Sequence, residues 1–322
     1  MLHTRLGNTV LEVSRIALGC MSYGDPAVGL HSWTLDEEAA QLFFRQAVEL
    51  GVTFWDTANV YQGGTSEEYV GRAIRRYSRR EDVVVATKVF GRMHDGPSGA
   101  GLSRAAIHEQ CDASLRRLGT DWIDVYFIHR FDDAVPVQET MAALHELVVA
   151  GKVRHLGASS MWAWQFAKLQ TAALVNGWTP FVAMQDQYNL LKREEEREML
   201  PMCADLGVGV VPYSPLGKGR LTRPWGEQTS RAAVDEVAKS FDSPADQPII
   251  QAVEQVARDR GVPMAQVALA WVLRNPVVVA PIVGATKTHH LVDAVAALHL
   301  QLTDDEVRRL EQPYVPQQPY WW

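Results

Sequence analysis

WIDVYFIH, residues 122–129, is a short and almost wholly apolar run that ends in a histidine. Its length and its β-branched and aromatic residues are typical of a strand that is covered on both faces, as the strands of a parallel sheet are. Amphipathic helical stretches lie before and after it. The run therefore predicts one strand in a repeated series of βα units.

Seven similar runs lie outward from this one, spaced by about thirty residues, which is the repeat of a βα unit. They are SRIALG near residue 16, VTFWD ending at Asp56, DVVVATK ending at Lys88, VRHLGAS near 155, FVAMQ near 183, VGVVPYS near 211 and VVVAPIVG near 280. Eight units allow an open doubly wound sheet or a closed barrel. The first run leads into ALGCMSYG rather than GxGxxG, and no Walker sequence GxxxxGK[ST] occurs, so we expect an α/β fold with a closed (β/α)8 barrel.

Turn and cap residues predict how the units begin and end. The stretch TRLGNTVLEV, residues 4–13, predicts a hairpin that turns at Gly7-Asn8 and plugs the bottom of the barrel. Residues 217–248 form one long insertion after the seventh strand, which we expect to contain a mobile loop. Capping boxes are predicted at Thr34 with Glu37 and at Thr65 with Glu68, and left-handed helix ends at Gly51, Gly119, Gly151 and Gly207.

Composition bounds the class of protein. The 322 residues are 47% hydrophobic and 21% charged, which is typical of a globular protein, and we expect residues 1–322 to form one domain. A net charge of -7 with intermixed charges disfavours a nucleic-acid partner. No apolar stretch has the length of a membrane span, and three scattered cysteines favour a reducing compartment, so we expect a cytoplasmic protein. The histidines form no HExxH or Cys/His group, so no metal site is expected.

Four polar residues follow the second, third and fourth strand runs. Asp56, Lys88 and His129 end those runs and Tyr61 lies five residues beyond Asp56, so all four should meet at the rim where a barrel carries its active site. A tyrosine, with a pKa of about 10, keeps a proton to donate at neutral pH, and a neighbouring ammonium group lowers that pKa. Asp56 would position Lys88, and His129 would hydrogen-bond an oxygen that gains negative charge. The set predicts reduction of a carbonyl group.

Each residue also has an ordinary structural reading, since a strand-end Asp often caps a loop, a Tyr often packs and a rim Lys is often solvated. The joint placement is what favours catalysis. A different enzyme class also fits a rim lysine: Lys88 could attack a carbonyl covalently, as in a Schiff-base lyase. A nucleotide-sensing regulatory subunit is a third reading, which the complete set of four residues disfavours.

FWDTANVY at 54–61, ATKV at 86–89, FIHR at 127–130 and GKVRHLGASS at 151–160 resemble successive motifs of the aldo-keto reductase family, over nearly the whole chain. The resemblance implies a catalytic tetrad of Asp56, Tyr61, Lys88 and His129, with NADPH as the hydride source. DQYNLLKREEEREMLP, RLTRPWG and the LEQPYVP tail are similar to a bacterial subgroup of aryl-aldehyde reductases and 1-deoxyxylulose-5-phosphate-forming enzymes.

The same resemblance implies the cofactor contacts. Ser159, Ser160 and Gln185 match positions that hold the carboxamide, and Tyr213 matches the aromatic residue stacked on the nicotinamide ring. The pyrophosphate loop would comprise Ser214, Pro215, Leu216, Gly217 and Gly219, and the 2'-phosphate region Gly284, Thr286 and Lys287. The chain departs from the family at Ser160, where Asn is frequent, and at His290 and Ala294, where Gln and Asn are common.

The residues that would choose a substrate lie in the loops beyond the strands. Candidates for lining the pocket are Tyr23, Trp33, Phe90, Arg130 and Trp162. The natural substrate, the oligomeric state and the role of Tyr320, Trp321 and Trp322 are left open by the sequence.

Overall fold

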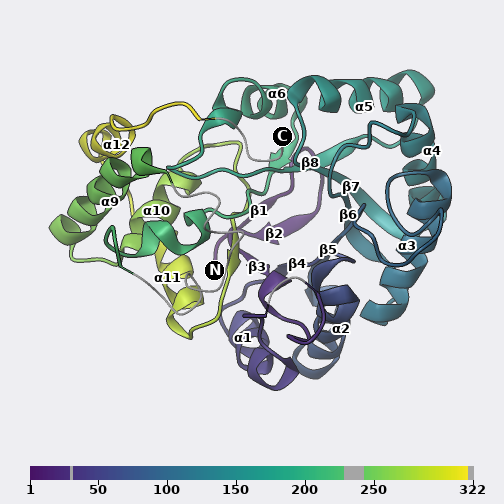
Figure 1. The fold of residues 1–322 in the computed structure, drawn as a ribbon, viewed down its shortest axis with the longest axis horizontal. Helices are drawn as coiled ribbons and strands as arrows, with labels where there is room; N and C mark the ends of the chain where they lie inside the picture. Colours follow the sequence, from purple (N-terminus) through teal and green to yellow (C-terminus); the bar gives the residue numbers. More distant parts are fainter. Residues whose placement is uncertain (30–31, 228–242, 318–322) are drawn as a thin grey trace.

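Eight parallel strands form the centre of the molecule (Figure 1). The computed structural model describes residues 1–29, 32–227 and 243–317. Neighbouring strands follow the order β10-β3-β4-β5-β6-β7-β8-β9. Their bounds are β3 Ala17–Gly19, β4 Phe54–Asp56, β5 Val84–Val89, β6 Ile123–Ile128, β7 Val153–Ser159, β8 Phe181–Gln185, β9 Gly209–Val210 and β10 Ile282–Gly284.

The sheet closes where β9 meets the run that leads into β10. Val210 N–H donates to the Val277 carbonyl at 3.0 Å, and Val279 N–H donates back to the Val210 carbonyl at 2.7 Å. Ile282 N–H donates to the Pro212 carbonyl at 2.9 Å. The closed (β/α)8 barrel predicted from the eight runs is therefore confirmed.

Helices surround the barrel in Figure 1, because each strand leads into a helix whose apolar face packs on the sheet. The α-helices are α1 Glu37–Glu49, α2 Thr65–Tyr77, α3 Arg104–Leu118, α4 Val137–Val149, α5 Ala163–Asn176, α6 Met199–Leu206, α9 Gln247–Arg260, α10 Met264–Leu273, α11 His289–Ala297 and α12 Asp304–Glu311. Short 3-10 helices are η1 Cys20–Ser22, η2 Tyr61–Gly64, η3 Arg80–Asp82, η4 Glu194–Glu196, η5 Gly217–Thr222 and η6 Pro244–Asp246. Among the described residues, no helix has both the length and the apolar character needed to cross a membrane.

The helix ends follow some sequence signals and not others. The four predicted glycines have φ between 65° and 72°, so the left-handed helix ends are confirmed. Both predicted capping boxes are wrong. Asp36 caps α1 by accepting from Ala39 N–H at 2.9 Å, two residues beyond Thr34. Thr65 is already inside α2, and its hydroxyl donates to the Gln62 carbonyl instead.

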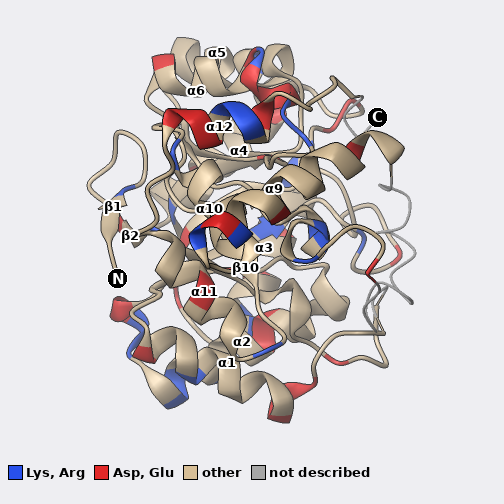
Figure 2. Cartoon of the chain, turned by 90° about the vertical axis from the view of Figure 1, so that its left-hand side faces the viewer, with Lys and Arg blue, Asp and Glu red and all other residues tan. Residues whose placement is uncertain are grey.

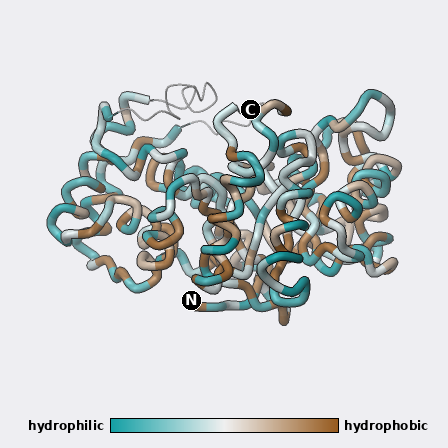
Figure 3. Tube along the Cα trace, turned by 90° about the horizontal axis from the view of Figure 1, so that it is seen from below, coloured by the Kyte–Doolittle hydropathy of each residue, from teal (hydrophilic) through white to brown (hydrophobic). Residues whose placement is uncertain are grey.

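An N-terminal hairpin closes the bottom of the barrel. β1 (His3–Arg5) pairs antiparallel with β2 (Glu12–Ser14), so the predicted hairpin is confirmed, with a turn over residues 6–11 that is wider than Gly7-Asn8 alone. Leu6 and Val13 are fully buried among the side chains of the barrel interior. A Cβ on Gly7 would meet the carbonyl oxygen of Gly207 at 2.6 Å, so only glycine allows this approach. Figure 3 shows the N-terminus at one end of the molecule.

The long insertion follows β9. Its described parts are η5, the residues up to 227, and residues 243–248, which contain η6 and lead into α9. The predicted mobile loop falls largely on residues 228–242, which lie outside the described residues. The Trp-rich C-terminal residues Tyr320 to Trp322 lie outside them as well.

Charges of both signs are interspersed on the face built by α9 to α12 (Figure 2). In α12 the acidic residues Asp304, Asp305 and Glu306 occupy the first turn and the basic residues Arg308 and Arg309 the last. Both placements favour the helix dipole. On this face the prediction of intermixed charges is confirmed.

A buried carboxylate joins three elements near the amino ends of β5 and β6. Asp124 accepts hydrogen bonds from the Val85 backbone N–H (3.0 Å) and from Trp122 Nε1 (3.1 Å). It also pairs with Arg80 at 2.7 Å and Arg154 at 3.0 Å, and both guanidinium groups lie 4.5 Å from the centre of the Trp122 ring. The side chain of Asp124 is only 3% exposed.

Asp124→Ala is expected to lower the free energy of unfolding by about 3 kcal/mol, because it leaves the buried Val85 N–H without its side-chain acceptor and removes the carboxylate that pairs with Arg80 and Arg154. Urea unfolding measures the loss. Asp82→Ala is the control, since it breaks an exposed ion pair with Arg79 of similar length and should leave the midpoint unchanged. Equal losses in both variants would contradict a role for burial.

Candidate active site

Side chains alternate between the two faces of each strand, and this alternation decides which polar side chains reach the open end of the barrel. Val84 and Ala86 of β5 point into the barrel interior, and Lys88 is the next residue of the same parity. In β6, Phe127 points inward, so His129 follows it on the same face just beyond the strand. The pattern repeats on three more strands, where the inward residues Phe54, Ala183 and Val211 precede Asp56, Gln185 and Tyr213.

Lys88 lies at the centre of the predicted tetrad. Its ammonium donates to Asp56 Oδ1 at 2.6 Å, to the Thr57 carbonyl at 2.7 Å and to the Tyr61 hydroxyl at 3.2 Å. An ammonium has three protons, so these three acceptors satisfy it completely. Lys88 is 0% exposed, and the sequence reading of a solvated rim lysine is therefore wrong.

Burial and pairing act in opposite directions on this ion pair. Burial disfavours the Lys88 ammonium, but the charge of Asp56 and the contact with Tyr61 outweigh it, and the pKa of Lys88 is raised. Burial also raises the pKa of Asp56, against the opposing effects of Lys88 and Gln185. The Lys88 ammonium is therefore the stable form at neutral pH.

Asp56 also connects opposite sides of the barrel. Its second oxygen, Oδ2, accepts from Gln185 Nε2 at 2.9 Å, and Gln185 ends β8. Both residues are nearly fully buried. The carboxylate is thus held by Lys88 on one oxygen and by Gln185 on the other, which fixes its rotamer.

The backbone turns sharply after Tyr61. Gln62 has φ 47°, and the next two residues are glycines with φ 60° and 97°. A left-handed Gln is unusual and needs support from its surroundings. The side chain of Gln62 is buried and donates to the Val28 carbonyl at 2.7 Å, which ties this turn to the loop after β3. Sequence reasoning missed Gln62; the adjacent Gly63-Gly64 was the available signal.

His129 lies against Tyr61, edge to face, with ring centres 5.8 Å apart. Its backbone N–H donates to the Val89 carbonyl at 2.9 Å, which continues the pairing of β5 with β6. Burial, together with the charges of Lys88 and Arg130, lowers the pKa of His129 well below its usual value. The imidazole is therefore neutral at pH 7, with one ring N–H to donate.

Two strand ends carry the residues predicted to hold a carboxamide. Ser159 ends β7, and its hydroxyl lies 3.2 Å from that of Ser160, which has a left-handed φ of 53°. Gln185 is committed through its Nε2 to Asp56, which leaves its amide oxygen as an acceptor. Tyr213 is half-buried beyond β9 and pairs with Gln187 as in a parallel ladder.

The loop predicted for a pyrophosphate is built from left-handed turns. Ser214, Gly217, Lys218 and Gly219 all have φ between 50° and 86°. Within the loop, the Gly217 N–H donates to the Ser214 carbonyl at 2.9 Å and the Gly219 N–H to the Leu216 carbonyl at 3.0 Å, so the turns are held by the loop's own hydrogen bonds. Pro215 is buried and has no N–H, so it shapes the turn, and Leu216 packs against the core.

Gly284 ends β10, and Thr286 and Lys287 follow before α11. Lys287 is exposed, as a residue that meets a phosphate should be. His290 Nδ1 accepts from the Thr286 N–H at 3.2 Å, so this side chain holds the backbone that leads into α11. Ala294 is fully buried in the core.

The prediction that Tyr23 lines a substrate pocket is wrong. This residue is 0% exposed, donates to the Ala285 carbonyl at 2.9 Å and packs on Phe43 and Phe44. Its hydroxyl and ring are therefore used by the core. Trp33, Phe90 and Arg130 are partly exposed and Trp162 is 41% exposed, so these four remain candidates.

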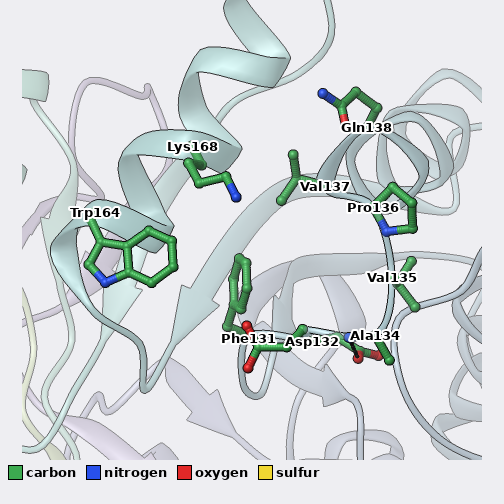
Figure 4. Close-up of a pocket in the computed structure, with 10 residues that line it drawn as sticks. Phe131, Asp132, Ala134, Val135, Pro136, Val137, Gln138, Trp164 and Lys168 are labelled. Atoms are coloured by element: carbon green, nitrogen blue, oxygen red, sulfur yellow. Dashed lines mark hydrogen bonds between the residues drawn. The ribbon is translucent and has the colours of Figure 1, made fainter.

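A cavity of about 380 Å³ lies beside the tetrad rather than at it, between the loop after β6 and α5 (Figure 4). The ring of Phe131 points into the space bounded by Trp164, Lys168 and Val137 in this view. Phe131 is two residues beyond His129, so its Cα lies within about 8 Å of the histidine's. The cavity is a neighbour of the polar cluster.

Comparison with known proteins agrees with this arrangement. Residues 15–314 match the model of the aldo/keto reductase family. The versiconal hemiacetal acetate reductase of Aspergillus parasiticus is 42% identical, with 98% of each chain covered. An aldo-keto reductase of Alternaria alternata is 45% identical over 98% of this chain and 92% of its own. A putative aryl-alcohol dehydrogenase of Schizosaccharomyces pombe is 41% identical over 97% of this chain and 95% of its own.

The similarity to named reductases therefore extends over nearly the whole chain. The chain belongs to the aldo/keto reductase family and is an oxidoreductase that reduces a carbonyl group to an alcohol.

Proposed function

We propose that the chain reduces an aldehyde or ketone with NADPH as the hydride source and Tyr61 as the proton donor. The observation that carries this proposal is the position of the buried Lys88 ammonium, which contacts both the Asp56 carboxylate and the Tyr61 hydroxyl. A phenol next to a fixed positive charge can release its proton, because the charge stabilises the phenolate that remains.

The protein's part in the reaction is to supply a proton and to stabilise charge. NADPH, when bound, supplies the hydride. The Tyr61 hydroxyl donates its proton to the substrate's carbonyl oxygen as that oxygen gains negative charge. The neutral His129 donates its ring N–H to the same oxygen. Lys88 compensates the phenolate, and Asp56 holds Lys88 in place.

The residues present suit a nicotinamide dinucleotide. Ser159, Ser160 and Gln185 offer hydroxyl and amide groups to a carboxamide, and Tyr213 offers an aromatic face. The glycines of the left-handed loop from Ser214 to Gly219 would let a diphosphate approach the backbone closely. Gly284 and Thr286 would line the site of the adenosine end of the cofactor. The exposed Lys287 offers a cation there, which would pair with the 2'-phosphate that only NADPH has.

The other readings of the sequence fit less well. A Schiff base forms on a neutral amine, whereas the pKa of Lys88 is raised and its three protons are all donated. A regulatory subunit would bind nucleotide without turnover, and a kinetic assay distinguishes it from a reductase.

For the substrate we propose an aryl aldehyde in the cytoplasm. Relatives named as putative aryl-alcohol dehydrogenases support this class, and so do the aromatic side chains of Phe131 and Trp164, which line the cavity beside the tetrad. The similarity to a bacterial subgroup that includes 1-deoxyxylulose-5-phosphate-forming enzymes stays a prediction, since the relatives quoted above are from fungi and yeast.

Nicotinamide fluorescence titration, followed by NADPH consumption with a panel of aromatic and aliphatic aldehydes, tests the proposal. We expect one NADPH per chain and faster turnover of the aromatic aldehydes. Binding without turnover of any carbonyl would favour the regulatory reading, and absence of binding would overturn the cofactor assignment.

Lys287→Ala is expected to weaken NADPH binding by about tenfold or more and to leave NADH binding unchanged, because it removes a cation that faces a phosphate found only in NADPH. Fluorescence titration with both nucleotides measures the difference. Lys168→Ala, another exposed lysine, is the control and should change neither. Equal losses for both nucleotides with Lys287→Ala would place the 2'-phosphate elsewhere.

A further inference from the structure

Asp186 is a fully buried carboxyl group among the residues proposed to receive the nicotinamide. It follows β8 directly, and its Oδ1 accepts from the Ser160 backbone N–H at 2.7 Å. Its own backbone carbonyl accepts from the Tyr213 N–H at 3.0 Å. Asp186 therefore connects the three segments that follow β7, β8 and β9.

The contact with Ser160 supports an unfavourable backbone. Ser160 has φ 53°, a left-handed conformation that a non-glycine residue keeps only where its surroundings hold it. Its N–H is also near the Gln185 carbonyl, at 3.3 Å, but the shorter bond is to the Asp186 side chain. The left-handed turn thus depends on the Asp186 acceptor.

The other carboxyl oxygen has a different environment. Asp186 Oδ2 is buried and has no hydrogen-bond partner, and Glu195 of η4 is a second buried carboxyl group on which the charge of Asp186 acts. Burial raises the pKa of Asp186, against the opposing effect of the Ser160 and Met161 N–H groups, and burial with the charge of Asp186 raises that of Glu195. A buried carboxyl with a free oxygen is costly, and a purely structural position would be better filled by an apolar residue.

We propose that Asp186 is a positioning residue for the cofactor: its side chain holds Ser160 in the arrangement that receives the nicotinamide end, next to Tyr213, which its backbone carbonyl holds. The assignment rests on the proposed function, because Ser160 and Tyr213 are cofactor contacts only if NADPH binds here. The Asp186 side chain touches neither the substrate nor the reacting atoms in this scheme, and acts through Ser160.

The test compares Asp186→Ala with Asp186→Asn by fluorescence titration of the cofactor-free protein with NADPH. We expect Asp186→Ala to raise the Kd about tenfold or more, since the Ser160 N–H loses the shorter of its two hydrogen bonds and keeps only the 3.3 Å contact with the Gln185 carbonyl. Asp186→Asn keeps an oxygen that can accept from the Ser160 N–H, so its Kd should stay within about threefold of the wild type. Asp124→Ala is the matched control: it removes a buried carboxylate at the other end of the barrel, so it should lower stability and leave the Kd unchanged.

Asp186→Leu replaces Asp186→Ala if the latter does not fold, because leucine fills the space and removes the repulsion with Glu195. A folded Ala or Leu variant with wild-type Kd would overturn the positioning role alone, as would failure of both to fold, which would make Asp186 a folding residue. Failure of Asp186→Asn to rescue binding would also overturn it. A wild-type protein that binds no NADPH would instead overturn the proposed function, and this assignment with it.

Discussion

Tyr61→Phe is expected to lower turnover by about 100-fold or more, the contribution of a general acid, while NADPH binding is retained. The substitution removes one oxygen and keeps the ring that packs edge to face on His129. Lys88 loses one of its three acceptors but keeps Asp56 and the Thr57 carbonyl, so the ion pair survives. The measurement pairs a fluorescence titration with a steady-state rate.

Tyr77→Phe makes the same chemical change at the end of α2 and serves as the control, with an unchanged rate. The informative result is an intact titration with a collapsed rate, since loss of activity alone would also follow from misfolding. A lyase acting through Lys88 would show a rate independent of nicotinamide. Undiminished carbonyl reduction by Tyr61→Phe would sink the mechanism.

Lys88→Met is expected to lower turnover about as much as Tyr61→Phe. It should also destabilise the fold by about 3–5 kcal/mol, the cost of leaving one member of a buried ion pair without its partner. The destabilised group is Asp56, which would remain buried with Gln185 as its side-chain donor. The two variants are therefore not equivalent: Tyr61→Phe removes the proton donor, whereas Lys88→Met removes the charge that helps it to release the proton. Urea unfolding measured beside turnover separates the two effects.

The double variant Asp56→Asn with Lys88→Met removes both charges. We expect it to recover most of the stability lost by Lys88→Met and none of the turnover, because the phenol still lacks its ammonium. Recovery of turnover in the double variant would show that the ammonium matters only for folding. Destabilisation as large as that of Lys88→Met would contradict the cost assigned to the unpaired Asp56.

Much of the fold could be predicted because a parallel strand carries its signal locally, in eight apolar runs and in the glycines that end helices. The proximity of Asp56, Tyr61 and Lys88 followed from the same rule, since strand ends of a barrel share one rim. That they act in catalysis, that the cofactor set from Ser159 to Lys287 binds NADPH, and that residues 1–322 form one domain stay predictions.

Other features depend on neighbours that are distant in sequence. Thr65 matches a capping box by spacing, but Asp25 N–H donates to its hydroxyl from forty residues away. Tyr23 follows the first strand like a pocket residue, yet Phe43 and Phe44 of α1 enclose it. Gln62 and Asp186 were missed because their importance lies in a left-handed backbone and a bond across strands, and neither leaves a periodic pattern.

The closure between β9 and β10 is the narrowest join of the barrel. β9 has two residues and β10 three, whereas β6 and β7 have six and seven, and three backbone hydrogen bonds connect β9 and the residue pair after it with the run into β10. Local opening is cheapest where few contacts must break, so amide hydrogen exchange should begin at this join. Tyr213 follows one side of this join and Lys287 follows the other. A dinucleotide bound by both residues would bridge the join, and because it binds only the closed form it would slow amide hydrogen exchange there.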